Sequence, residues 1–427
     1  MKKVQVTIIL PILVLLISHP AAGQAGSSSL DWGLVEAAGQ GDTATVLRLL
    51  QQGANIEAAG RFGDTPLLRA VWRNNLKMVR LLLEKGANPN GGGAPALVMA
   101  VDQANVDMVK LLLDKGADPK AKDGSGHTAL FEAVDRGHTD MVKLLLDRGA
   151  DAEYLALRFA AARGDADVVG LLLEKGANIN AGSGIEETAL HEGARNGRTA
   201  VVKLLLEHGA NTEVKDRSKR TPLHVAAEEG QTEVAKLLLE SGAKLEARDD
   251  HGGTVLHAAA QRGRTEVVKL LLDKGANLEA RDDEGFTPLL RAAQAGGIMH
   301  MRREGPDIEK FPAVDTVNLL LDKGANLEAK SNDGQTALHR AAFRARPDVV
   351  KVLLKRGANL QVMDNHGNTP LDLANASLRH WERTAGQGTG NQSPASRQIV
   401  EKTITDKQEV VRLLEEALAK HPPSKEL

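Results

Sequence analysis

A pattern of small, apolar and polar residues recurs along most of the chain. In its clearest copy, Thr-Pro-Leu-His at 221–224 is followed by Val-Ala-Ala, then by Gly230, and then by the apolar segment 234–239. Apolar residues three and four positions apart in both segments predict two short amphipathic helices, and the glycine between them favours a turn. Gly242 follows the second segment, where a helix commonly ends on glycine. Each copy therefore predicts a pair of helices joined by a tight turn.

The copies recur at a nearly fixed distance. The slot of Thr221 is filled in the other copies by Thr65, Pro95, Thr128, Leu155, Thr188, Thr254, Thr287, Thr336 and Thr369. Successive copies lie 30, 33, 27, 33, 33, 33, 33, 49 and 33 residues apart. A dominant period of this length indicates structural repeats that stack on one another.

The repeated residues have physical reasons for their positions. Thr221 can accept from early backbone N–H groups of the first helix, and Pro222 stands at the first helical position, where its missing N–H costs nothing. Only 2% of the residues are aromatic, so Leu, Ala and Val must fill the core. Alanine pairs such as Ala226-Ala227 allow helices to approach closely, which suits thin stacked layers.

This period and motif resemble the ankyrin repeat, from about Leu30 to His421. The resemblance implies an all-α repeat solenoid, in which each helix-turn-helix unit carries a β-turn finger. It also implies a concave face, lined by fingers and first helices, that binds other proteins. We expect a capping helix pair at 30–55, a repeat array of about ten repeats at 56–421, and a C-terminal capping helix at 406–421.

Two fingers are shortened and two insertions interrupt the array. The 30- and 27-residue spacings predict blunt turns at 89–94 and 151–154. One insertion lies near 296–312, and the other near 375–405 includes a glycine- and serine-rich stretch at 385–396 whose composition predicts flexibility. Trp381 with Arg302, Arg303 and Arg383 could form a second recognition surface. The alternative, which we favour, is a tolerated insertion whose Trp381 covers the C-terminal cap.

The N-terminus has the order of residues of a secretory signal peptide. Lys2 and Lys3 precede an apolar stretch from Val4 to Ile17, and small residues follow up to Gly23. The stretch is shorter than the roughly 20 residues of a membrane-spanning helix. We expect residues 1–23 to be a cleaved signal peptide, with retention as an anchor the alternative, and the mature protein to be periplasmic or secreted without stable membrane insertion.

Charge and cysteine content exclude several classes of function. The net charge is −2, so no basic field favours nucleic acid. The chain has no cysteine, which excludes disulfides, a thiol nucleophile and Cys-ligated zinc. No cofactor is expected, and the protein is expected to be a monomer.

Histidines and acidic pairs in the repeats invite a catalytic or metal-binding interpretation. His191, His224, His257 and His339 share one slot, but stacked repeats lie about 10 Å apart, too far to share a metal ion bound at about 2.1 Å. The resemblance instead implies that this histidine fastens the turn by hydrogen bonds. Asp249-Asp250 and Asp282-Asp283 recur in one turn slot without a nucleophile or a calcium loop, so we interpret them as solvated turn formers.

The candidate contacts are chosen by their slots in the repeat. The basic segment Lys215–Arg220 would meet an acidic partner, or it is a solvated loop. Phe62 and Phe286 occupy finger positions, where each ring is either exposed for contact or packed on a neighbouring finger. The full set of candidate protein-binding residues is Arg61, Phe62, Trp72, Arg73, Lys122, His127, Arg217, Lys219, Arg248, His251, Phe286 and His366.

The expected function is a non-enzymatic scaffold that binds an unidentified partner protein by rigid docking. One alternative is a secreted effector that engages a host protein. The other is an envelope enzyme or glycan binder that uses the insertions, which offer only the scattered groups His300, Glu304, Asp307 and His380.

Overall fold

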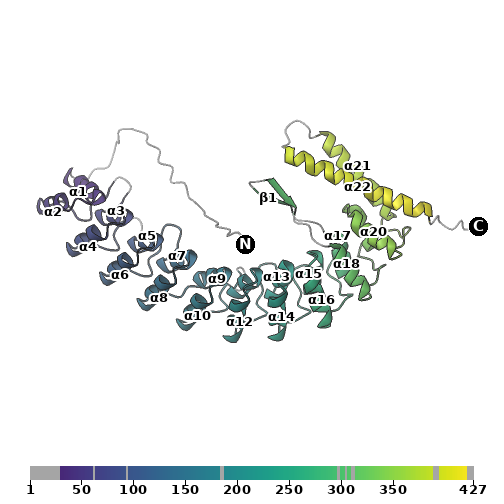
Figure 1. Cartoon of the computed structure of the whole chain (residues 1–427), viewed down its shortest axis with the longest axis horizontal. Helices are drawn as coiled ribbons and strands as arrows, with labels where there is room; N and C mark the ends of the chain where they lie inside the picture. Colours follow the sequence, from purple (N-terminus) through teal and green to yellow (C-terminus); the bar gives the residue numbers. More distant parts are fainter. Residues whose placement is uncertain are drawn as a thin grey trace, which may run out of the picture. The chain divides into compact units, whose positions relative to one another are not determined.

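The computed structural model describes residues 29–60, 63–92, 95–182, 187–295, 299–302, 305–308, 313–387 and 394–420. Within these ranges the chain forms 22 helices and two short strands, and the helices follow one another in pairs (Figure 1). The chain divides into two compact units, Met1–Ala129 and Leu130–Leu427, which are described separately.

The described part of the first unit is built from short helix pairs. They are α1 (Ser29–Gln40) with α2 (Thr43–Gln51), α3 (Pro66–Trp72) with α4 (Leu76–Glu84), and α5 (Ala96–Asp102) with α6 (Val106–Asp114). The first helix of each pair packs on the next first helix, α1 on α3 and α3 on α5, while α4 packs on α6. The segment predicted as an N-terminal capping pair contains α1 and α2.

The second unit is likewise built from helix pairs, and α7 begins at the last residue of the first unit. Its helices are α7 (Ala129–Arg136), α8 (Thr139–Asp147), α9 (Tyr154–Arg163), α10 (Ala166–Glu174), α11 (Ala189–Arg195), α12 (Thr199–Glu207), α13 (Pro222–Glu229), α14 (Thr232–Glu240), α15 (Val255–Gln261), α16 (Thr265–Asp273), α17 (Pro288–Gln294), α18 (Ala313–Asp322), α19 (Ala337–Phe343), α20 (Pro347–Lys355), α21 (Pro370–Gln387) and α22 (Pro394–Lys420). From α9 to α21 the odd-numbered helices, called first helices below, pack successively, as do the even-numbered second helices from α8 to α20, with α22 packed on α20. The predicted repeat solenoid is confirmed.

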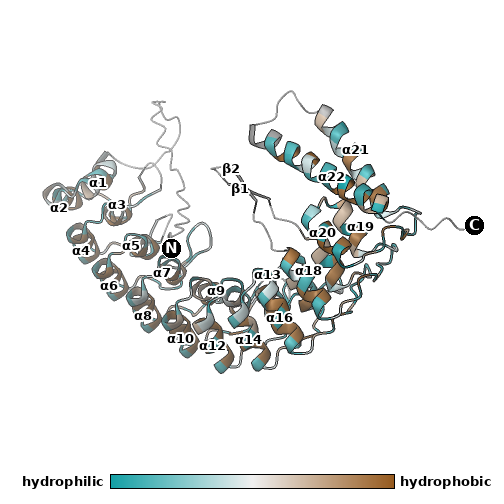
Figure 2. Ribbon diagram, turned by 45° about the vertical axis from the view of Figure 1, so that its right-hand side comes forward, coloured by the Kyte–Doolittle hydropathy of each residue, from teal (hydrophilic) through white to brown (hydrophobic). Residues whose placement is uncertain are grey.

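The core of the second unit is made of layers that repeat the same residues. Leu205, Leu238, Leu271, Leu320 and Leu353 come from successive second helices, and each is fully buried. Burying one such side chain contributes about 1.5–3 kcal/mol to stability. Apolar and polar residues lie on different sides of helices such as α14 and α16 (Figure 2). The apolar sides face the neighbouring helices, because a single repeat is too thin to bury its own apolar side.

The turn residues adopt the backbone geometry that their identity predicts. Gly230 ends α13 at φ 78°, in the left-handed region that favours glycine, and its N–H donates to the carbonyl of Ala226. Gly242 ends the second helix of that pair at φ 88°. α9 departs from the expected boundary: it begins at Tyr154, before the slot residue Leu155, because Leu155 cannot cap a helix as threonine does.

The four repeated histidines each link their own repeat to the next. In all four cases the threonine hydroxyl lies 2.9 Å from the histidine Nδ1. The Nε2 of His257 lies 2.9 Å from the carbonyl oxygen of Phe286 in the next repeat. Because the Thr254 N–H donates to Nδ1, that nitrogen must be an acceptor, and Nε2–H is the donor to the carbonyl. The predicted hydrogen-bonding role of these histidines is confirmed.

The two insertions contain more regular structure than the sequence suggested. In the first, β1 (Met299–Arg302) pairs with β2 (Gly305–Ile308) in an antiparallel hairpin, which the glycine- and proline-containing sequence did not predict. In the second, α21 extends to Gln387 and α22 begins at Pro394 rather than at Asp406. These two long helices pack on each other. Both reach into the stretch 385–396, which was predicted to be flexible.

Candidate protein-binding surface

The fingers of the second unit are closed by aspartate side chains. Asp249 Oδ1 accepts from the N–H groups of His251 and Gly253 at 2.9 and 2.8 Å. Asp216, Asp282 and Asp364 accept two finger N–H groups in the same way. The prediction that these residues form turns is correct, but Asp282 is not solvated, since only 7% of its surface is exposed.

Neighbouring fingers are joined edge to edge. The N–H of Asp250 donates to the carbonyl of Ser218, and the N–H of Asp283 donates to the carbonyl of His251, each at 3.0 Å. Arg248 Nη1 donates to the carbonyls of Gly252 and Arg281 at 2.6 and 2.8 Å. Arg248 is exposed, as expected of a candidate contact, but its guanidinium joins two neighbouring fingers by hydrogen bonds.

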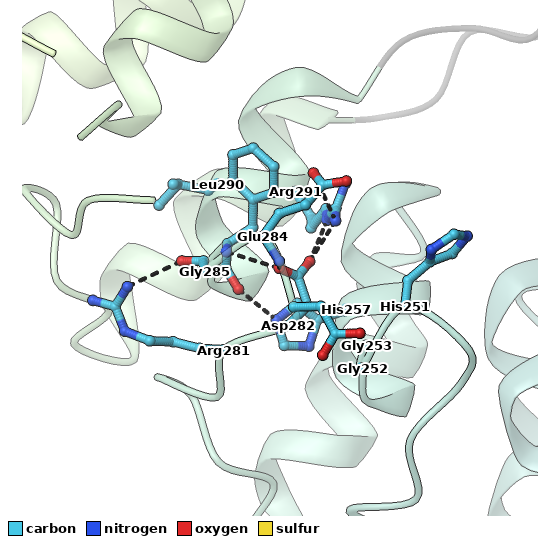
Figure 3. A network of polar contacts seen from close by, with 12 residues as sticks. His251, Gly252, Gly253, His257, Arg281, Asp282, Glu284, Gly285, Leu290 and Arg291 are labelled. Carbon is cyan, nitrogen blue, oxygen red and sulfur yellow. Dashed lines mark hydrogen bonds and ion pairs between the residues drawn. The ribbon is translucent and has the colours of Figure 1, made fainter. Parts of the chain in front are cut away.

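Asp282, Glu284 and Arg291 form a network of polar contacts in the finger that precedes α17 (Figure 3). Phe286 lies beside this network, and its N–H donates to Asp282 Oδ1 at 2.9 Å. Only 4% of its surface is exposed, and it packs with Leu290 and Ala329. The guanidinium carbons of Arg291 and Arg340 lie 4.5 and 4.9 Å from its ring centroid. Arg291 also donates to the buried carboxylate of Asp282. An exposed contact ring at Phe286 is therefore wrong, and the alternative, a ring packed between repeats, is correct.

The basic finger at 215–220 divides its charges between the interior and the surface. Arg220 pairs with Asp216 at 2.7 Å and with Glu228 at 2.8 Å. Burial alone would raise the pKa of Asp216, but hydrogen bonds from Arg220 hold it below its usual value. Arg217 and Lys219 remain exposed. The finger thus presents Arg217 and Lys219 to solvent.

The other predicted contacts are distributed between the two units. In the first unit, Trp72, Arg73 and Lys122 are exposed and His127 is half-buried. In the second unit, His251 and His366 are exposed at finger tips. The structure brings Arg217, Arg248 and His251 onto adjacent fingers. Arg61 and Phe62 lie outside the described residues.

The sequence interpretation missed Phe343, which is 40% exposed at the end of α19. It stands seven residues after Thr336, as Trp72 stands seven residues after Thr65, whereas α11, α13, α15 and α17 place Arg195, Glu228, Gln261 and Gln294 there. Trp72, in its own unit, is 53% exposed and lies 4.7 Å from the Arg73 guanidinium carbon. Comparing this slot across repeats would have identified both aromatic residues.

The described parts of the insertions favour a structural role for Trp381. This side chain is half-buried, and Lys407 Nζ of α22 lies 5.8 Å from its ring centroid. The side chains of Arg302 and Arg303 lie outside the described residues, so the predicted patch with Trp381 stays a hypothesis.

No group of three His, Asp or Glu side chains in the described part of the chain is placed to hold a metal ion. A groove of about 540 Å³ lies between α20 and α22, lined by residues that include Lys351, Leu354, Leu413 and Glu416. No described helix is long and apolar enough to cross a membrane.

The stacked helix pairs, the joined fingers and the histidine links define a helical repeat protein. A family model for ankyrin repeats, in sets of three copies, matches residues 34–123, 97–183, 157–249, 241–302 and 309–381. The chain belongs to the ankyrin-repeat family, whose members generally act as non-enzymatic scaffolds for protein interactions.

Curated relatives match short parts of the chain. The ankyrin repeat, SAM and basic leucine zipper domain-containing protein 1 of Carollia perspicillata is 42% identical over 50 residues, which are 12% of this chain and 10% of that protein. The protein of that name from Notamacropus eugenii is 38% identical over 66 residues, 16% of this chain and 14% of that protein. The mitochondrial disaggregase of Bos taurus is 43% identical over 65 residues, 15% of this chain and 10% of that protein. The chain thus matches only about a tenth of each relative's length.

Proposed function

We propose that this protein is a non-enzymatic scaffold that binds a partner protein outside the cytoplasm. The binding face consists of the fingers and first helices of the second unit. The observation that carries the proposal is the row of joined fingers, which presents exposed side chains such as Arg217, Lys219 and His251 on a hydrogen-bonded frame. A frame ordered before binding loses little conformational entropy on association.

The test is a crosslinking capture from the native cell envelope, using the mature chain from Gln24 to Leu427. A variant with Arg217→Ala, Lys219→Ala and His251→Ala is expected to lose the partner. The control variant carries Lys236→Ala and Lys269→Ala, which remove two exposed charges from the second helices α14 and α16. Capture that survives the finger substitutions, or disappears equally in the control, would contradict the assignment of the finger face. Capture only from host material would favour the secreted effector.

The compartment has a separate test. Removal of the leader after Gly23 or Ala25 is expected to give a mature chain that begins at Gln24 or Gly26. N-terminal sequencing of the protein from periplasmic and culture fractions measures this directly. Intact Met1 in a cytoplasmic fraction would contradict export.

A further inference from the structure

Several arginines on or next to the first helices of the second unit pair with carboxylates of the same repeat or the next one. Arg158 pairs with Glu192 at 2.9 Å, and Arg195 pairs with Glu187 and Glu229. Arg220 pairs with Asp216 and Glu228, as described above. Arg158, Arg195 and Arg220 are therefore each paired with a carboxylate.

The end of α19 differs from the rest of this face. Arg340, Arg344 and Arg346 lie on or just after this helix, and Lys407 of α22 lies against it; we call these four residues the α19 cationic cluster. None of the four makes an ion pair with any carboxylate of the described ranges. Arg340 donates instead to the amide oxygens of Gln294 and Gln335. Lys407 donates to Ser377 Oγ at 2.6 Å and to the Phe343 carbonyl at 3.4 Å.

The four cations act on one another. Burial, together with Arg344 and Arg291, lowers the pKa of Arg340, against smaller opposing effects of Glu284 and Asp333. Burial and Arg344 lower the pKa of Arg346, against a smaller opposing effect of Asp406. Burial, Arg344 and Arg346 lower the pKa of Lys407. Arg344 is the common neighbour of the other three, so a positive potential is concentrated around an exposed guanidinium.

Two geometric features of the cluster favour an added acceptor: two exposed side chains and one hydrogen-bond donor without a partner among the described residues. Arg344 is exposed and its guanidinium carbon lies 5.9 Å from the ring centroid of Phe343, which is itself 40% exposed. The Nε of Arg346 is buried and has no hydrogen-bond partner among the described residues. An unsatisfied buried donor is costly, so an added acceptor at this position would be favourable.

We propose that the α19 cationic cluster binds an acidic segment of the partner protein. Asp or Glu carboxylates pair with Arg344 and Arg346, and an apolar side chain packs on Phe343. Arginine and carboxylate form strong, directional pairs, and an aromatic anchor beside arginine is the usual composition of an interface hot spot. Charge complementarity favours an acidic segment, and the compact patch on a chain of net charge −2 lacks the extended basic stripe of a nucleic-acid binder. This inference rests on the proposed scaffold function.

The experiment measures binding of a labelled peptide of repeated Glu-Glu-Leu to the mature chain by fluorescence anisotropy at low salt. Arg344→Glu is expected to weaken binding about tenfold or more, because it reverses the central charge. Phe343→Ala is expected to weaken it about threefold. The control Lys355→Glu makes the same charge change at an exposed residue of α20 and should alter binding less than about twofold. Circular dichroism of each variant establishes that the fold is kept.

Several results would overturn the proposal. One is that the native chain does not bind the peptide. Another is that Arg344→Glu and Lys355→Glu weaken peptide binding equally. A third is that duplex DNA or inorganic polyphosphate binds more tightly than the peptide, in a way that depends on Arg344. The envelope capture separates this failure from failure of the scaffold function. A partner that is captured but is not displaced by the peptide or lost with Arg344→Glu leaves the scaffold intact and removes only this site.

Discussion

His257 offers the most direct test of how neighbouring repeats are coupled. This side chain is 3% exposed, accepts from the Thr254 N–H at 3.1 Å, and reaches the Phe286 carbonyl at 2.9 Å. His257→Ala leaves both main-chain groups buried without these partners, each at a cost of about 1–3 kcal/mol, so we expect the free energy of unfolding to fall by about 2–6 kcal/mol. Equilibrium urea unfolding at pH 7.5 measures it. His251→Ala, whose side chain is 78% exposed, is the control and should stay within about 0.5 kcal/mol of the native chain.

The same variant has a defined pH dependence. Burial lowers the pKa of His257 below the reference value of 6.5, so the folded protein keeps the ring neutral. As the pH falls below 6.5, the unfolded chain takes up a proton that the folded chain refuses, and the stabilisation contributed by His257 is lost. The stability difference between native and His257→Ala chains should therefore be largest above pH 6.5 and shrink toward pH 5. A difference that is constant between pH 7.5 and 5, or below about 0.5 kcal/mol throughout, would refute the reasoning.

Three further substitutions test the finger and cap geometry by urea or thermal unfolding. Gly252→Ala should lower the free energy of unfolding more than Gly275→Ala does. Both glycines have positive φ, but only at Gly252 would the added methyl group meet Asp283. Equal losses of stability would contradict this. Asp282→Ala should lower the free energy of unfolding by about 3 kcal/mol, since it removes the acceptor of two finger N–H groups and leaves Arg291 with only the longer pair to Glu284. The exposed Asp283→Ala should be nearly neutral. Lys407→Met should change the free energy of unfolding by less than about 1 kcal/mol, because it removes a buried charge that has no carboxylate partner among the described residues. Ser377 Oγ still donates to the Phe343 carbonyl at 3.1 Å. A loss above about 2 kcal/mol would contradict this.

The repeat fold could be predicted because each local signal agrees with the stacked structure. Thr221, Pro222 and Gly230 each favour the same boundary of α13, and the regular spacing repeats this signal many times. The boundaries that differed are those where such signals are absent. Leu155 provides no cap for α9, and the polar residues before Asp406 are compatible with either a loop or the helix α22.

The candidate site was less predictable because exposure depends on neighbours that are distant in sequence. Phe286 occupies a finger slot that suggests exposure, but Arg291 and Arg340 cover its ring. Arg248 and Arg220 look like free cations until their partners in the fingers and adjacent helices are known. Lys407 is far from Arg344 in the chain, so the α19 cationic cluster could not be assembled from local patterns.

The direction of the histidine links has a consequence for how the chain becomes ordered during synthesis. The Nε2 of His191, His224, His257 and His339 bonds a carbonyl 29 residues later, never one in an earlier repeat. A newly emerged repeat with this histidine therefore lacks one of its hydrogen bonds until the next finger has also left the ribosome or the translocation channel. Folding from the N-terminus would run one repeat behind chain emergence, and a pause in elongation would leave the last emerged repeat the most exposed to proteolysis.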